Sequence, residues 1–220
     1  MSIALFQSTK LVSLYDEVRP AIPRVPKPTV LRVARHVARQ FFERTNAWRC
    51  DLEYLPLIDG VYRYSLPVTL YGHNVTLNRV LALNVGTCKL EPASEQMLAT
   101  RYGTWRQATG EPRYYYTDRA DDVLIAPVPA ANRDSLLAGT ITVKPSLKTD
   151  YIPTDLYTEY QDSLLAGVLA ELYKMPDRTW FNGQLAAVHA TRYAELEMAA
   201  KSHAANDDTP KARTTRYGGY

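Results

Sequence analysis

Histidines and cysteines, the side chains most often used in catalysis and metal binding, are few in this sequence and follow no known pattern. The four histidines are His36, His73, His189 and His203. None accompanies a nucleophile or a set of metal ligands, so each is interpreted as a solvated or interface histidine. Cys50 and Cys88 have no further cysteine or histidine at the spacing of a zinc site. We therefore expect no metal site and no cofactor.

Clustered carboxylates are the next candidates for chemistry. Asp118, Asp121 and Asp122 carry oxygen ligands of the kind that Ca²⁺ prefers. Their spacing is not that of an EF-hand loop and Arg119 lies among them, so a turn before the strand at Val123 is the better interpretation. A glycine-rich phosphate loop is also missing. The sequence therefore does not predict an enzyme.

Arginines gather on one face of a strongly periodic segment. Apolar residues recur at three- and four-residue spacing after Thr29, which predicts an amphipathic helix that ends near Asn46. Arg32, Arg35 and Arg39 fall on its other face. These arginines could contact phosphate, or acidic residues of a neighbouring subunit. The alternative is that they only form the solvent-exposed face of the helix.

The C-terminal residues form a second basic feature. From about Ser202 the apolar periodicity ends, which predicts a tail that cannot fold alone. Its cations and tyrosines suit phosphate contact and base stacking, or anchoring in a groove of a partner protein. The candidate residues for such a contact are Lys211, Arg213, Arg216, Tyr217 and Tyr220.

Composition narrows the class of protein. The net charge of +3, from 26 basic and 23 acidic residues, is too small to predict nucleic-acid binding by itself. No apolar run is long enough to cross a bilayer and no signal peptide is recognisable, so we expect a protein made in the cytoplasm with no membrane partner. The 16 tyrosines, against 4 phenylalanines, suit either interfaces or strands.

The order of the expected elements predicts an α+β fold. The expected fold is a small helical bundle, made of one N-terminal helix and a C-terminal helical hairpin. An antiparallel β domain is inserted between these helices in the chain, and extended arms lie at both ends. Asp59-Gly60 is a hairpin turn pair, and Asp177 after Pro176 can cap the last helix. A short turn at 13–18 precedes the prolines of the first arm. The expected domains are a proline-rich arm at 1–28, a helical bundle at 29–52 and 153–203, a β domain at 53–147 and a tail at 204–220.

The helical hairpin resembles phage head-to-tail adaptor (connector) proteins. The likeness lies in the Ile-Pro start at Ile152, the Gly167-Val-Leu-Ala-Glu-Leu core, the Met-Pro-Asp break at Met175, the downstream Trp180 and the Tyr193-containing last helix. The strand-rich stretch that ends in Pro-Val-Pro at 127–129 is also similar to the middle of those proteins. Gly167 costs helix stability, so we expect another helix to approach it closely, either Trp180 or the first helix.

The resemblance implies a structural virion protein at the head–tail interface. It would form a homo-oligomeric ring, a dodecamer in the family pattern, that docks on the portal protein and meets a tail or nozzle protein. C-terminal tails would reach into portal clefts, and genomic DNA would pass through the channel. The alternatives are a tail-completion or neck protein that contacts the tail tube, and a DNA-binding module that uses the basic helix face and the tail.

Overall fold

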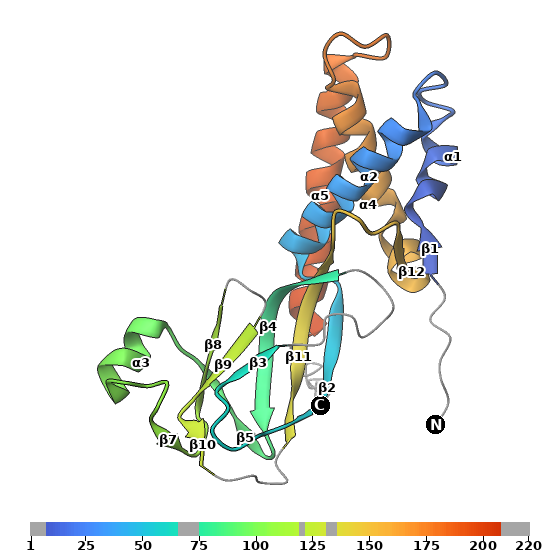
Figure 1. The fold of residues 1–220 in the computed structure, drawn as a ribbon. Coiled ribbons are helices and arrows are strands. Elements are labelled where there is room, and N and C mark those ends of the chain that lie inside the picture. The colour runs from blue at the N-terminus through green and yellow to red at the C-terminus, as the bar shows by residue number, and fades with distance from the viewer. Residues whose placement is uncertain (1–7, 66–74, 119–121, 131–135, 208–220) are drawn as a thin grey trace, which may run out of the picture. The chain divides into compact units, whose positions relative to one another are not determined.

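The chain divides into two compact units, and neither shares a helix or strand with the other. The computed structural model describes residues 8–65, 75–118, 122–130 and 136–207. One unit combines Met1–Ala47 with Asp150–Tyr220, and the other is Trp48–Thr149. The first is mainly helical and the second mainly strands (Figure 1). The predicted mixed α+β class is therefore confirmed.

The helix α2 (Lys27–Thr45) begins and ends where its backbone chemistry requires. Pro26 precedes it with extended backbone and a proline occupies its first turn, where a missing N–H costs nothing. Asn46 ends it in the left-handed conformation with φ 54°. Its apolar face is buried throughout and includes Phe41 and Phe42, both 0% exposed. This face is the part of the helix that packs on the rest of the unit.

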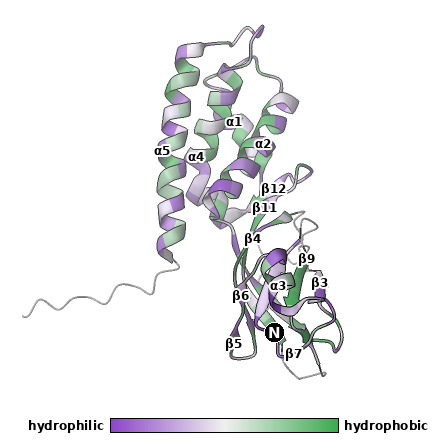
Figure 2. Cartoon of the chain, turned by 90° about the vertical axis from the view of Figure 1, so that its left-hand side faces the viewer, coloured by the Kyte–Doolittle hydropathy of each residue, from purple (hydrophilic) through white to green (hydrophobic). Residues whose placement is uncertain are grey.

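The helix α4 (Thr154–Tyr173) contacts both α2 and α5 (Gly183–Asp207), and the pair α4 and α5 runs side by side (Figures 1 and 2). Gly167 marks a close approach of these helices. A Cβ placed on it would lie 2.6 Å from Val37 Cγ1 and 2.9 Å from two ring carbons of Tyr193. The nearest side chains to Gly167 therefore come from α2 and α5.

The N-terminal residues pack on their own unit. The strand β1 (Ser8–Lys10) pairs antiparallel with β12 (Tyr151–Pro153), and the short helices η1 (Leu11–Ser13) and α1 (Leu14–Val18) follow it. Residues 11–18 are thus helical, so the short turn expected at 13–18 is present, whereas the extended path expected for the arm 1–28 does not hold there. The reason is apolar spacing, because one buried stripe runs through Leu11, Leu14, Val18, Ile22 and Val25.

A polar network also ties α1 to α4. The Tyr157 hydroxyl donates to Glu17 at 3.0 Å and accepts from Ser13 at 2.9 Å. Gln161 donates to the same Glu17 carboxylate at 2.8 Å. Burial raises the pKa of Tyr157 to about 12, so this hydroxyl stays a donor at neutral pH. The N-terminal segment is therefore held by polar contacts as well as by its apolar stripe.

The start of α5 differs from the sequence prediction. Asn182 caps the helix, with its side-chain oxygen accepting from the backbone N–H groups of Gln184 and Leu185 at 3.1 Å each. Asp177 instead lies in the connection with φ 60°. The predicted Asp177 cap is therefore wrong, and Trp180 precedes α5 rather than belonging to it. The helix also continues to Asp207, past the predicted end at 203.

The first sheet of the β unit has the strand order β2-β11-β4-β5. All of its pairs are antiparallel, and β11 makes a bulge next to Gly139. A Cβ on Gly139 would lie 2.1 Å from the Ala82 carbonyl oxygen, so only glycine fits where β11 approaches its neighbouring strand this closely. The strands are β2 (Arg49–Pro56), β11 (Leu136–Pro145), β4 (Val75–Val85) and β5 (Cys88–Lys89).

The second sheet has the order β3-β9-β8-β6, and a short parallel pair joins β7 to β10. The pair β6–β8 is also parallel, so the prediction of an antiparallel β domain is only partly right. Asp59-Gly60 does form a turn, but β2 and β3 on either side of it belong to different sheets, so the predicted hairpin is wrong. The strands are β3 (Arg63–Ser65), β9 (Asp122–Ala126), β8 (Tyr114–Thr117), β6 (Glu91–Pro92), β7 (Thr109–Gly110) and β10 (Val128–Pro129).

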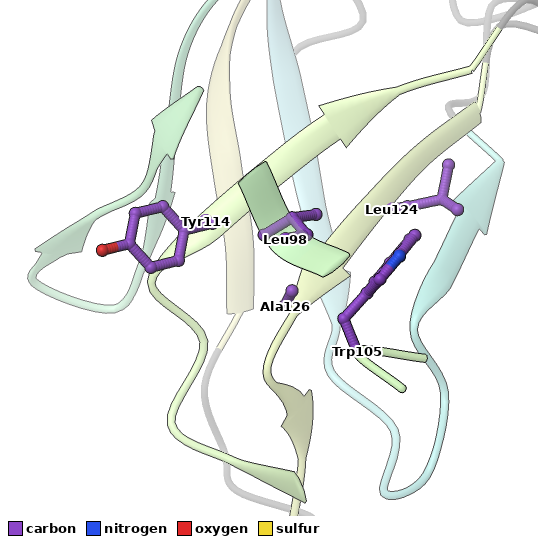
Figure 3. Packing of buried hydrophobic residues seen from close by; sticks show 5 residues of the cluster. All are labelled: Leu98, Trp105, Tyr114, Leu124 and Ala126. Atoms are coloured by element: carbon purple, nitrogen blue, oxygen red, sulfur yellow. The ribbon is translucent and has the colours of Figure 1, made fainter. Parts of the chain in front are cut away.

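The helix α3 (Glu95–Tyr102) covers part of this second sheet. Its Leu98 is 0% exposed and packs with Trp105, Tyr114, Leu124 and Ala126 in one apolar cluster (Figure 3). The Ser94 side chain caps the helix by accepting from the Met97 N–H at 3.2 Å. The β unit thus has an apolar core that combines a helix with strands.

Candidate protein-interaction surfaces

The reactive side chains of the described residues form no catalytic or metal-binding group. His189 stacks on Tyr173 with ring centroids 5.7 Å apart, and burial lowers its pKa, which favours the neutral imidazole. His36 is exposed on α2, and His73 lies outside the described residues. Cys50 is buried, which raises its pKa to about 11 and keeps it a thiol. Across the described ranges, no three histidines, cysteines or carboxylates gather as metal ligands.

The aspartates considered for Ca²⁺ have an arginine as their partner instead. Arg63 Nε lies 2.5 Å from Asp122, and its NH2 group lies 3.6 Å from Asp118. Ser65 also donates to Asp122 at 2.7 Å, and these two donors lower the pKa of Asp122. Asp121 falls outside the described residues. The cluster therefore joins β3 to β9 as a structural ion pair.

The basic face of α2 is present, and its three arginines differ in surroundings. Arg32 is exposed, whereas Arg35 is half-buried and pairs with Asp150 through Nε at 2.7 Å. Arg39 is half-buried and also has interactions within the chain. The face opposite the buried stripe thus remains a candidate for partner contact, with Arg32 its most accessible cation. A role for these residues in subunit or channel contact stays a prediction.

A pocket of about 430 Å³ lies where the connection between α4 and α5 meets the N-terminal segment. Arg178 lies over the Trp180 ring at 5.9 Å, and the buried Trp180 Nε1 has no hydrogen-bond partner within the described part of the chain. Trp180 therefore borders this pocket, and it is not among the atoms nearest Gly167. The apolar lining comprises Ala21, Ile22, Pro23, Trp180, Phe181 and Leu185.

An exposed apolar row continues from the pocket along α5. Phe181 is 54% exposed, Leu185 38% and Val188 61%. Leu185 and Val188 lie three residues apart on one flank of α5 and Phe181 lies just before the helix, while Ala200 and Ala204 belong to the buried face. Large apolar groups exposed together on one helix flank are typical of a surface that a partner covers.

An acidic row lies on the first half of α4, and the sequence interpretation missed it. Asp155, Glu159 and Asp162 are all exposed and follow the spacing of one helix face. Glu159 lies 3.7 Å from His203, and Asp162 lies 3.9 Å from Arg192, both on α5. The signal was available in the sequence as the four- and three-residue spacing of the carboxylates.

The tail residues proposed to bind a portal lie outside the described residues. These are Lys211, Arg213, Arg216, Tyr217 and Tyr220. Within the described ranges, every helix is too short or too polar to span a lipid bilayer.

The helical unit thus exposes apolar and charged helix faces, and among the described residues no histidines, cysteines or carboxylates gather as metal ligands. The family model described as SU10 adaptor protein matches residues 9–216. The chain belongs to this family of phage head–tail adaptors, which confirms the resemblance seen in the sequence. It is thus a phage adaptor and a virion component of a structural family. A search of curated proteins found no match.

Proposed function

We propose that this adaptor forms a homo-oligomeric ring that docks on the portal and connects it to the tail. The observation that carries the proposal is the family match over 9–216, because it spans the helical unit and the inserted β unit together. A ring around the portal axis would leave a channel for genomic DNA. The portal, a tail or nozzle protein, and further copies of the chain are the proposed partners, and a dodecamer is the proposed ring.

The C-terminal tail is the proposed portal-binding element. It combines arginine and tyrosine, the residue types that dominate the binding energy of protein interfaces. We assign this role to Lys211, Arg213, Arg216, Tyr217 and Tyr220. The basic face of α2, with Arg32, Arg35 and Arg39, is assigned to subunit or channel contact. The helical bundle and the β insertion are the proposed functional domains, with assembly in the host cytoplasm.

Light scattering on a sizing column tests the proposal, with the purified protein alone and then mixed with its portal ring. We expect a monomer that shifts into a complex of fixed mass, from which the number of adaptor subunits follows. No co-elution at any mixing ratio would remove the portal as partner. Binding to the tail tube would then favour the neck-protein alternative, and DNA binding that weakens steeply with salt would favour the DNA-binding alternative.

Two tail variants separate charge from aromatic anchoring. One replaces Lys211, Arg213 and Arg216 with glutamine, and the other replaces Tyr217 and Tyr220 with alanine. Both should weaken portal binding and leave the unfolding temperature of the protein unchanged. A chain that ends at Asp208 should lose portal binding altogether, and full binding by this truncated chain would overturn the tail assignment.

A further inference from the structure

The flank that α5 shares with α4 has two chemical parts. Its apolar part is the exposed row Phe181, Leu185 and Val188. Arg192 and His203 continue the same flank toward the C-terminal end of α5, since they follow Val188 at helical spacing. Both contact the acidic row of α4, so these residues of α5 link the apolar row to the carboxylates, which lie toward the other end of the hairpin. We call this surface the α4–α5 flank.

The α4–α5 flank carries more negative than positive charge. Asp155, Glu159 and Asp162 supply three carboxylates, whereas Arg192 is the cation that faces them and lies 3.9 Å from Asp162. His203 is 3.7 Å from Glu159 and adds charge only when protonated. A partner of the acidic part should therefore offer cations.

The basic face of α2 has this chemistry. Arg32, His36 and Arg39 have the same four- and three-residue spacing as the carboxylates of α4. Arginine combines an aliphatic stem, which can cover apolar side chains, with a guanidinium that binds carboxylates. Arg32 is exposed and Arg39 half-buried, so the face is accessible although Arg39 has interactions within the chain.

Within one copy the two surfaces cannot meet. The basic face lies opposite the buried stripe of α2, which includes Val37, Ala38 and Phe41 and packs toward α4 and α5. The basic face is therefore turned away from the α4–α5 flank of its own chain. A second copy of the chain can bring them together.

We infer that α2 of one copy lies along the α4–α5 flank of the next copy. The inference deepens the proposed ring, on which it rests. Two different surfaces form this contact, so each copy offers one surface to each neighbour and the arrangement can close into a ring. The acidic row of α4 would be neutralised by the basic face of α2.

The size of the contact predicts how it behaves. With 19 residues, α2 is about 28 Å long, and a strip about 10 Å wide would cover roughly 300 Å² per copy. Stable complexes bury about 800 Å² per partner, so this contact alone should be weak. Its charges also make it sensitive to salt. Adaptors should therefore associate mainly when the portal brings them side by side.

Cysteine cross-linking tests the contact directly. In a Cys88→Ser background, which removes the exposed native thiol, His36→Cys and Glu159→Cys place one cysteine at the centre of each row. A short bis-maleimide should convert the double variant into a ladder of covalent oligomers. A mixture of the two single variants should give dimers, and each single variant alone should give none.

The outcomes distinguish the contact from the proposed function. Self-cross-linking of either single variant would mean a symmetric contact, and a double variant that gives no ladder at high concentration or on portal rings would also overturn the inference. Portal rings saturated with adaptor but without a ladder would leave the proposed function standing. A ladder formed by a protein that never binds portals would leave the contact standing and overturn the proposed function.

Charge reversal provides a second measurement. Arg32→Glu should reduce ladder formation at least several-fold, and Asp162→Lys should do the same, because each puts like charges together across the contact. Their combination in one chain restores opposite charges and should recover the ladder. Equal loss in the single and combined variants would contradict the pairing, provided that all three unfold at the parent temperature.

Discussion

Gly167 on α4 and Val37 on α2 lie so close that a Cβ on the glycine would be 2.6 Å from Val37 Cγ1. The Tyr193 ring closes the other side at 2.9 Å. Gly167→Ala should gain about 1 kcal/mol of helix propensity and lose about 1–3 kcal/mol through overpacking. We expect a net loss of about 1 kcal/mol in the free energy of unfolding, measured by urea denaturation.

Gly183 provides the matched control for this variant. It also lies in a helix, but a Cβ there would meet nothing within 4 Å. Gly183→Ala should therefore leave stability unchanged or raise it slightly. Equal effects of the two substitutions would contradict the close helix crossing at Gly167.

Asp122 should make the β unit sensitive to acid. Hydrogen bonds from Ser65 and Arg63 lower its pKa, so the folded state favours the charged carboxylate more than the unfolded state does. This stabilisation is complete above the ordinary aspartate pKa of about 4 and is lost as pH falls through the lower folded pKa. Asp122→Asn should lower stability at neutral pH and flatten its decline toward about pH 3.

Urea denaturation at several pH values measures this effect. Asp118→Asn is the control, because Asp118 is more exposed and lies 3.6 Å from the same arginine. We expect this control to keep nearly the parent pH dependence, since exposed ion pairs contribute little. An unchanged pH dependence of stability in Asp122→Asn would show that the ion pair of Asp122 does not cause the acid sensitivity.

Asn182 should contribute measurably to the stability of α5. Its side chain accepts from two backbone N–H groups at the start of the helix. Asn182→Ala should cost about 0.5–2 kcal/mol of unfolding free energy, because these donors lose their partner. Asp177→Gly is the comparison, since Asp177 has φ 60° and glycine adopts that conformation readily. If the glycine variant lost more stability than the alanine variant, the cap would be at Asp177 after all.

Two neighbouring residues of α3 should differ sharply in their effects. Leu98 is 0% exposed in the apolar cluster of Figure 3, whereas Met97 is 38% exposed. Leu98→Ala should cost about 2–5 kcal/mol through a cavity, and Met97→Ala less than about 0.5 kcal/mol. Thermal unfolding monitored by tryptophan fluorescence checks both, because Trp105 belongs to the cluster. Similar losses in the two variants would mean that α3 does not cover this cluster.

The helices could be predicted from the sequence because their signals are local. The periodicity after Thr29 predicts α2 closely, and the Ile-Pro start predicts α4. The prediction of a cap at Asp177 was wrong because Pro176 before it is a strong signal for a helix break. The true cap is Asn182, five residues after Asp177. The buried stripe from Leu11 to Val25 was equally visible, but the prolines beside it favoured an extended interpretation.

Strand pairing could not be predicted because its determinants are distant. Asp59-Gly60 is a proper turn signal, yet β2 pairs with β11 and β3 pairs with β9, each far along the chain. The same limit applies to the charged surfaces. The arginine row of α2 is evident from spacing, whereas the pairing of Arg35 with Asp150 spans 115 residues. Local patterns do not reveal such partners.

The helices of the helical unit come from chain segments before and after the β unit, so they leave the ribosome at different times. The hydrogen bond from Thr9 to Thr154 spans 145 residues. Phe41 and Phe42 therefore stay without α4 and α5 while Trp48–Thr149 and then the two helices are translated, and the first of these steps alone takes about 5–20 s at typical rates. The β unit can fold in that interval, while α2 must wait as an exposed apolar helix, the state in which a nascent chain needs a chaperone most.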